Sequence, residues 1–372
     1  MTSSKVPWAT LTLLGIHLVV SAFLFGKPQS EWNWGFIPHP TPPMSLSEMG
    51  LRALTSLFLH VDPLHLLTNL LVLAAMGPSV EGATGSFRFL LVYLFAGIAG
   101  TGSHALMTLL LQRGGAEPLV GASASIAGLI GYAWLRFYRY RVPILPRVFI
   151  PVWLLAGLWA FLQIAGGILE ATRGSPIAYW AHLGGFLTGF LFAVFFKAGS
   201  QAQWEIWHER LEEARKQGPS ALLNAAEGFL REFPDALPAL AARVESLLQL
   251  GETERAREAT LQLIATDPTY LNGYGARMLL EQNWAGSLPA SQRIRLADQI
   301  RPISPTTAEQ LLLTILTEPP NPITPRALFM LAEMTQEKDR SGASLYAQQL
   351  IREFPLTPEA DLLRQKYPQL LS

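Results

Sequence analysis

The chain of 372 residues contains no cysteine and little charge. Without cysteine, a disulfide, a thiolate metal site and a cysteine nucleophile are all excluded. Charged residues make up 15% of the sequence, which is well below the roughly 25% of soluble domains. The formal net charge of +0 provides no basic footprint for nucleic acid. The shortage of charge therefore predicts a membrane portion, and we expect no nucleic-acid partner.

The few charges are unevenly distributed along the chain. Residues 1–197 are mostly apolar, whereas glutamate and arginine are dense from residue 201 onward. The pattern predicts an all-α protein with three parts. These are a membrane domain at 1–197, a juxtamembrane linker helix at 198–218 and a cytoplasmic helical domain at 219–372.

Long hydrophobic runs are abundant in the first part. A membrane-spanning helix needs about 20 mainly apolar residues, and six stretches qualify: 8–25, 63–80, 87–111, 121–138, 148–169 and 178–196. The first is interpreted as a retained span rather than a cleaved signal peptide, because Gly26-Lys27-Pro28 follows it without a small-residue cleavage pattern.

Lysine and arginine in the short connections predict the orientation of these spans. If the N-terminus is cytoplasmic, the strongest basic cluster, 136–141, is also cytoplasmic, and so is the soluble tail. We therefore expect an integral, multi-pass protein of the lipid bilayer with both termini in the cytoplasm. Compact loops and the lack of cysteine favour a bacterial inner (plasma) membrane. On this side lie Lys5, Arg88, Arg136, Arg139, Arg141, Arg147 and Lys197.

The second, fourth and sixth predicted spans all enter the membrane from the outer face. Their first turns contain His65, Ser123 and His182, which places these side chains at similar depth. Asn69 follows His65 by four residues, so both project from one helix face. Polar and ionisable groups inside a membrane usually serve a function, although each could also simply bond a neighbouring helix.

Rows of small residues predict a close approach of the fourth and sixth spans. That approach would bring Ser123 within hydrogen-bond reach of His182, as a serine nucleophile requires of its base. The alternative is that the glycines only pack helices, which leaves the flanking Ser and His unexplained. The rows are Ser123, Ala127 and Gly131 with Ala124 and Gly128, and Ala181, Gly185 and Gly189.

Three separated motifs resemble the rhomboid family of intramembrane serine proteases. The family's pattern of His, four residues, His, three residues and Asn occurs as His60, His65 and Asn69. Its Gly-x-Ser motif occurs as Gly121-Ala122-Ser123, and its sixth-span motif as Ala181, His182, Gly185 and Gly189. Trp34-Gly35-Phe36-Ile37-Pro38 resembles a first-loop segment of bacterial members. The match covers roughly the first 197 residues, and three motifs in this order are specific.

The resemblance implies a six-helix bundle and a Ser123–His182 dyad that cleaves transmembrane-helix substrates near the outer membrane face. It assigns oxyanion or substrate binding to Asn69, His65, Gly121 and Ala122, and supporting roles to His60 and Gly185. His60 is expected to hydrogen-bond the loop or His65. No cofactor or metal is expected, because His60 and His65 lack a nearby carboxylate and make a poor ligand set.

Other polar residues in the spans receive structural interpretations. Ser125 is the rival nucleophile, but it is rotated about 200° around the helix from Ser123. His17 and His104 are interpreted as interhelical hydrogen-bonding groups. Two departures from the family concern its usual Gly after the nucleophile, here Ala124, and its Tyr that stacks on the base, here Ala127. The Ala124 methyl group is expected to crowd the substrate.

The tail begins with Trp204, Trp207 and Leu211, a stripe that could lie along the lipid headgroups. Leu250-Gly251-Glu252-Thr253-Glu254-Arg255-Ala256 resembles a tetratricopeptide repeat, and Arg-Glu-Phe-Pro recurs at 231–234 and 352–355. The segment 285–325, rich in Pro and Thr, is expected to interrupt the array. Such a short solenoid is expected to bind a protein or peptide partner, or else to be a cap that only stabilises the membrane domain or mediates self-association.

Three functions compete. The first is an active intramembrane serine endopeptidase with a tetratricopeptide-like tail. The second is a non-proteolytic rhomboid-like protein that binds membrane helices, and the third is a transporter or channel. Transport is disfavoured because the ionisable groups are few and cluster at one face.

Overall fold

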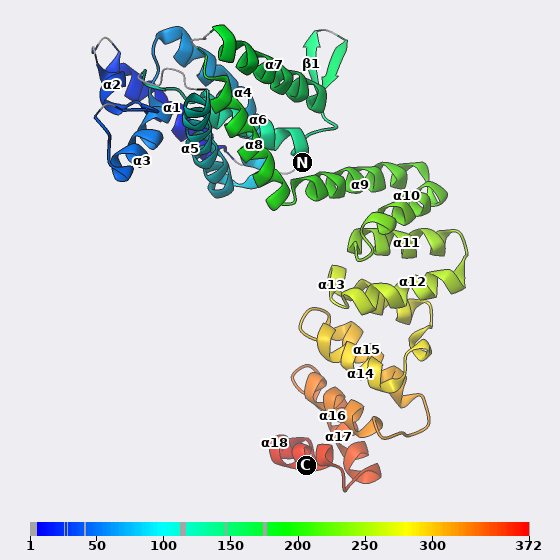
Figure 1. Cartoon of the computed structure of the whole chain (residues 1–372). Helices are drawn as coiled ribbons and strands as arrows, with labels where there is room; N and C mark the ends of the chain where they lie inside the picture. Colours follow the sequence, from blue (N-terminus) through cyan, green and yellow to red (C-terminus); the bar gives the residue numbers. More distant parts are fainter. Residues whose placement is uncertain are drawn as a thin grey trace. The chain divides into compact units, whose positions relative to one another are not determined.

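The fold is all-α apart from one small hairpin (Figure 1). The computed structural model describes residues 6–25, 27, 29–40, 42–111, 117–145, 147–173 and 177–371. The chain divides into two compact units, Met1–Gln203 and Trp204–Ser372. Each unit is described by itself.

The first unit is a bundle of helices around α5, α6 and α8, with the long helices drawn side by side in Figure 1. Its elements are α1 (Trp8–Leu24), α2 (Ser30–Trp34), α3 (Leu46–Thr55), the 3₁₀ turn η1 (Ser56–Phe58), α4 (Pro63–Thr84), α5 (Ser86–Leu110), α6 (Ser123–Arg136), β1 (Arg141–Leu145), β2 (Val148–Pro151), α7 (Val152–Arg173) and α8 (Tyr179–Phe195).

Among the described residues, three helices are long and apolar enough to cross a membrane, namely Pro63–Thr84, Ser86–Leu110 and Val152–Leu169 within α7. A fourth is possible if α8 and α9 (Ala198–Gln217), bent by 59°, form one span, and Trp8–Leu24 is a shorter apolar helix. Six spans therefore stay a prediction. The expected span at 148–169 is wrong at its start, because residues 148–151 form the second strand of the antiparallel β1–β2 hairpin.

Helix α4 begins where its sequence provides a cap. The Asp62 carboxylate accepts a hydrogen bond of 2.8 Å from the backbone N–H of His65, and Pro63 occupies the first helical position. Both are favoured at a helix start, where the backbone N–H groups have no partner within the helix. The cap fixes His65 in the first turn of α4.

Helices α6 and α8 pack with their backbones in contact. A Cβ atom at Gly189 would lie 1.8 Å from the carbonyl oxygen of Gly128, and one at Gly185 would lie 2.1 Å from that of Ala124. Only glycine permits such an approach. The close approach predicted from the small-residue rows is thus present, and α5 completes the contact because a Cβ at Gly100 would meet Ala124.

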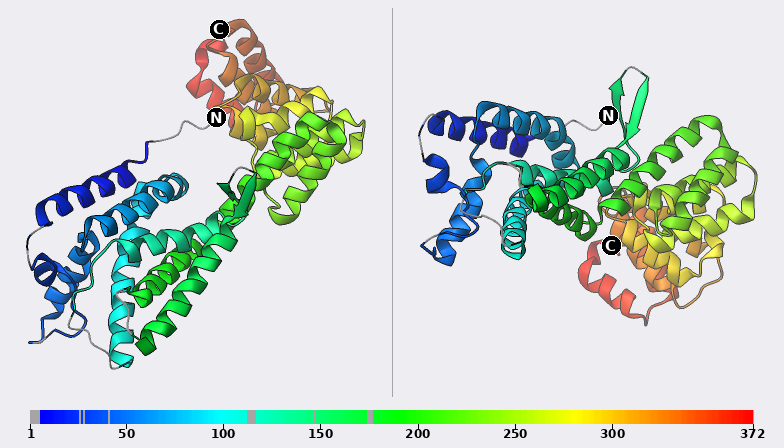
Figure 2. Two further views of the ribbon diagram at one scale, coloured as in Figure 1. Left: turned by 90° about the horizontal axis from the view of Figure 1, so that it is seen from above. Right: turned by 45° about the horizontal axis from the view of Figure 1, so that its top comes forward.

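A buried carboxylate joins α1 to α4, two helices that run side by side in Figure 2. Glu81 accepts hydrogen bonds from the backbone N–H groups of Ala9 and Thr10, at 2.9 and 2.8 Å, and from the Thr10 hydroxyl at 2.7 Å. The Ser86 hydroxyl donates to the same carboxylate at 2.6 Å. Glu81 therefore caps the start of α1 from a different helix, where the helix dipole favours negative charge.

The second unit is a succession of helices that pack on their neighbours in the sequence (Figure 1). They are the C-terminal part of α9, α10 (Pro219–Glu232), α11 (Leu237–Gln249), α12 (Thr253–Thr266), α13 (Tyr270–Glu281), η2 (Ala285–Ser287), α14 (Ala290–Ile300), α15 (Pro305–Leu316), α16 (Thr324–Thr335), α17 (Arg340–Glu353), α18 (Pro358–Lys366) and η3 (Pro368–Leu370).

Two expectations for the tail are wrong. Trp207 and Leu211 face the tail's own core, since Leu211 is buried beside Phe229 and the rings of Trp207 and Phe229 stack at 6.1 Å. Trp204 meets Phe229 edge to face at 4.9 Å. The segment 285–325 continues the array, because α14 and α15 bury Leu296, Ile300, Leu311 and Ile315 in one core.

A polar contact near the end of the tail joins α14, α16 and the segment after α18. Glu333 accepts hydrogen bonds from Arg301 at 2.8 Å and from the Tyr367 hydroxyl at 2.9 Å. Partial burial acts to raise the pKa of Glu333, but these hydrogen bonds outweigh it, so the pKa lies below its ordinary value of 4.5. The contact therefore stabilises the ionised carboxylate.

Candidate functional site

The turn before α6 is built around Gly121, whose φ of +123° lies in a region that favours glycine. Its N–H donates to the carbonyl oxygen of Ser56 at 2.9 Å. A Cβ at this position would lie 2.8 Å from Cε1 of His65. Glycine at position 121 is thus explained by the backbone conformation and by the nearby imidazole. The turn places Ser123 at the first position of α6.

Ser123 and His182 lie in hydrogen-bond contact, although 59 residues separate them in the sequence. His182 Nε2 is 2.8 Å from Ser123 Oγ. Ser123 begins α6, and His182 is the fourth residue of α8. The tight α6–α8 packing one turn away holds the two helix starts together. The hydroxyl and the imidazole have the geometry of a nucleophile and its general base.

The starts of α4 and α6 carry hydrogen-bond donors that are not used up within their helices. The α6 hydrogen-bond ladder begins with the N–H of Ile126, which donates to Ala122 O at 3.0 Å, so the backbone N–H of Ser123 belongs to the helix start that has no intrahelical acceptor. Asn69 donates one amide hydrogen to the backbone oxygen of His65 at 3.0 Å, and its amide carries a second hydrogen. Ala122, which precedes Ser123, is buried in the core of the bundle.

His60 meets His65 through its ring. The two imidazoles lie edge to face with centroids 5.1 Å apart, and His60 also meets His17 at 5.4 Å. Within the described part of the chain, no hydrogen bond joins a ring nitrogen of His60 to His65. Of the two hydrogen bonds expected of His60, to the loop or to His65, the one to His65 is therefore wrong, and these two rings meet by packing.

The sequence reasoning missed two residues of α7 that contact His182. Gln163 Oε1 lies 2.8 Å from His182 Nδ1, and the Trp159 ring lies 6.2 Å from the imidazole at an interplanar angle of 34°. They are four residues apart, so both lie on one face of α7. The signal available in the sequence was this polar and aromatic pair within an otherwise apolar run.

Both departures from the family pattern lie in helix packing. Ala124 is 4% exposed, and its methyl group points toward Gly100 of α5, so the expected crowding of a substrate is wrong. Ala127 is fully buried. The aromatic ring beside His182 comes instead from Trp159 on another helix.

The remaining polar residues of the spans have different surroundings. Ser125 is fully buried, and its hydroxyl lies against Gly97 of α5. His17 joins α1 to α5 through a 2.7 Å hydrogen bond to the Tyr93 hydroxyl, as predicted. His104 Nδ1 has no such partner within the described ranges. Over those same residues, no cluster of three His, Asp or Glu could hold a metal ion.

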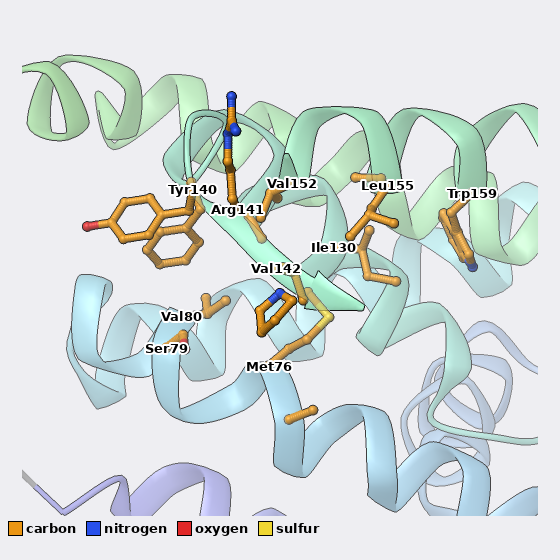
Figure 3. Close-up of a pocket in the computed structure, with 15 residues that line it drawn as sticks. Met76, Ser79, Val80, Ile130, Tyr140, Arg141, Val142, Val152, Leu155 and Trp159 are labelled. Atoms are coloured by element: carbon orange, nitrogen blue, oxygen red, sulfur yellow. The ribbon is translucent and has the colours of Figure 1, made fainter. Parts of the chain in front are cut away.

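An apolar cavity of about 720 Å³ lies between α4, α6, α7 and the β1 strand (Figure 3). Trp159 lines one end of it and also contacts His182. Tyr140 and Arg141 lie at the other end, beside the hairpin. The remaining lining is mainly aliphatic, with Met76, Val80, Ile130, Val142, Val152 and Leu155 among the side chains shown.

The fold and the site define a helical membrane protein with a serine and a histidine paired at two helix starts. Residues 47–198 match the sequence model of the Rhomboid domain. The chain therefore carries a domain of the rhomboid family, as its motifs indicated, and this domain contains both Ser123 and His182.

Known relatives agree with this assignment. The chain is 31% identical over 163 residues to RHOMBOID-like protein 2 of Arabidopsis thaliana, covering 42% of this chain and 45% of that protein. It is 28% identical over 196 residues to the Rhomboid protease GlpG of Klebsiella pneumoniae, covering 50% and 61%. It is 40% identical over 80 residues to the Rhomboid protease GluP of Bacillus subtilis, covering 22% and 14%. The aligned regions thus span only part of each relative.

Proposed function

We propose that this protein is an intramembrane serine endopeptidase that cleaves transmembrane-helix substrates near the outer membrane face. The observation that carries the proposal is the 2.8 Å contact between Ser123 Oγ and His182 Nε2 at the start of two helices. The membership of its domain in the rhomboid family, which includes the proteases GlpG and GluP, supports the same reaction.

In the first half of the reaction, Ser123 Oγ attacks the carbonyl carbon of the scissile peptide bond while His182 Nε2 takes the hydroxyl proton. The tetrahedral intermediate then collapses. The C–N bond breaks, and the imidazolium gives its proton to the leaving amine. In the second half, His182 deprotonates a water molecule that attacks the acyl ester, which releases the new carboxyl group and restores the Ser123 hydroxyl.

The negative charge on the carbonyl oxygen needs donors that are already in place. The backbone N–H of Ser123 is one, because it belongs to the free N-terminus of α6. The second amide hydrogen of Asn69 and the ring of His65 are the side-chain donors on the α4 side. Removal of one such donor typically lowers the rate by ~10²–10³. Gly121 and Ala122 form the wall along which the substrate backbone would lie.

An apolar substrate segment requires an apolar surface next to the dyad. The cavity between α4 and α7 provides such a surface and ends at Trp159, beside His182. A helical substrate must unwind locally there, because a helix engages its carbonyl groups in its own hydrogen bonds. The lipid bilayer and a transmembrane protein substrate are thus the proposed partners.

The wider setting follows from charge and composition. We further propose that both termini lie in the cytoplasm, because the basic cluster at 136–141 favours that side, and that the membrane is a bacterial inner membrane. With the proposed domains at 1–197, 198–218 and 219–372, the helical, tetratricopeptide-like tail would then also lie in the cytoplasm. There it would bind a protein or peptide partner.

The test uses the full-length protein in liposomes with a fluorescently labelled transmembrane-helix substrate. Wild type is compared with Ser123→Ala and His182→Ala, and Ser125→Ala is the matched control because its hydroxyl is buried on another face of α6. We expect cleavage by wild type and by Ser125→Ala, and none above background by the other two. A fluorophosphonate probe should label Ser123 in wild type and in Ser125→Ala, and should give no labelling above background in Ser123→Ala and His182→Ala.

Two results would contradict the proposal. Cleavage that persists in Ser123→Ala would remove the serine from the reaction. Binding of substrate helices without cleavage or probe labelling in wild type would instead establish the alternative, a non-proteolytic rhomboid-like protein that binds membrane helices.

A further inference from the structure

His182, the proposed base, has a hydrogen-bond partner at Nδ1, the ring nitrogen that takes no part in the proposed reaction. His182 Nε2 faces the Ser123 hydroxyl at 2.8 Å, and His182 Nδ1 faces Gln163 Oε1, also at 2.8 Å. The imidazole is therefore held at both nitrogens by side chains from two other helices, α6 and α7. A base held only by helix packing would lack the second contact.

The identity of the atom at Nδ1 decides which tautomer the imidazole adopts. A neutral imidazole has one N–H and one acceptor nitrogen, whereas an amide oxygen only accepts. With Oε1 facing it, Nδ1 must carry the proton and donate to Gln163. Nε2 is then the acceptor, which is the form that can take the proton of Ser123. A rotated amide would present its N–H group and enforce the opposite, unproductive tautomer.

Trp159 fixes the imidazole in a second way. It lies one turn before Gln163 on the same face of α7, with its ring 6.2 Å from that of His182 and 5.8 Å from that of Phe186. Ring packing restrains the tilt of the imidazole but does not choose where its proton lies. The choice of tautomer therefore falls to Gln163 alone among these contacts.

We propose that Gln163 is a positioning residue for His182, which it holds in the Nδ1–H tautomer and stabilises when the ring becomes charged. This role rests on the proposed serine protease function. In the acyl-transfer step the Gln163 oxygen gains interaction energy as the imidazolium forms, since a charged donor makes the stronger hydrogen bond. Its effect should thus appear mainly in kcat rather than KM.

The experiment compares Gln163→Leu and Gln163→Glu in the full-length protein in liposomes. Leucine has no acceptor, so kcat should fall roughly 10- to 100-fold, a part of the ~10²–10⁴ that a general base contributes, with KM within about twofold of wild type. Glutamate keeps an acceptor oxygen and should retain most of the rate. Leu162→Ala is the control, because this neighbour on α7 is 53% exposed.

A spectroscopic measurement separates this proposal from the function on which it rests. The ¹⁵N shifts of labelled His182 should report the Nδ1–H tautomer in wild type and in Ser123→Ala, and a mixture of tautomers in Gln163→Leu. These shifts remain readable even if no substrate is cleaved, a result that would overturn the protease function alone. An unchanged tautomer in Gln163→Leu, or a Gln163→Glu variant as slow as Gln163→Leu, would overturn the role of Gln163.

Discussion

A single methyl group at Gly185 should separate the proposed nucleophile from its base. A Cβ at this position would lie 2.1 Å from the carbonyl oxygen of Ala124, whereas ordinary contact begins at 3.4 Å. The obstacle is backbone rather than a flexible side chain, so Gly185→Ala must move α8 away from α6 by about 1.3 Å, the difference between these two distances. The contact lies one turn from His182, next to Ser123.

The same displacement at the helix starts would lengthen the Ser123–His182 contact from 2.8 Å to about 4 Å, which is too long for a hydrogen bond. A misplacement of ~1 Å in an active site can lower the rate by ~10²-fold. Overpacking of this kind also costs about 1–3 kcal/mol of stability. We therefore expect Gly185→Ala to lose roughly two orders of magnitude in kcat/KM while it remains folded.

The assay is cleavage of a transmembrane-helix substrate in liposomes, together with the rate of fluorophosphonate labelling and the thermal midpoint in detergent. Gly102→Ala is the matched control, because it also lies within a helix but a Cβ there would meet nothing within 4 Å. It should keep full activity and an equal or higher midpoint. Wild-type cleavage and labelling by Gly185→Ala would show that the α6–α8 contact does not position the dyad.

Further predictions concern other contacts. Gly121→Ala combines an unfavourable φ with a clash against His65 and should lower both cleavage and expression, while Gly82→Ala, with open space around it, should not. Glu81→Gln leaves donors at the start of α1 poorly satisfied and should cost about 1–3 kcal/mol, seen as a lower thermal midpoint than that of wild type. Because the pKa of Glu333 is lowered in the folded tail, its contribution is complete above the ordinary pKa of 4.5 and is lost as pH falls below it. In wild type, the protection of α16 amides from hydrogen exchange, corrected for intrinsic rates, should fall as the pH drops below this value. An equal fall in Glu333→Gln would refute the role of the Glu333 carboxylate.

Much of the fold could be predicted from hydropathy, because the requirement for an apolar surface applies to each membrane helix separately. Each buried helix needs its own apolar run, so the six runs correspond to α1, α4, α5, α6, α7 and α8. The β2 strand could not be read in this way, because Val148, Phe149 and Ile150 are as apolar as the helix that follows them. In the tail, the stripe of Trp204, Trp207 and Leu211 fits a lipid surface and a protein core equally well, and only the packing against Phe229 decided between them.

The residues of the candidate site also fall into two groups, those that the sequence predicted and those that only the structure revealed. Ser123 and His182 were predicted from the sequence because helix starts and rows of small residues are local patterns, and two helices that approach closely must bring their first turns together. Gly121 was predicted only from the resemblance to the family. Gln163 and Trp159 were not predicted, because an apolar helix does not indicate which of its faces meets a neighbour. The direction of the Ala124 methyl group was misjudged for the same reason.

The sequence by itself thus determined where helices begin and which of them can touch, since both depend on residues close together in the chain. Only the tertiary structure decided what lies on the far side of the His182 ring. That position is filled from α7, 19 residues away in the chain, and its occupant depends on how one helix is rotated against another.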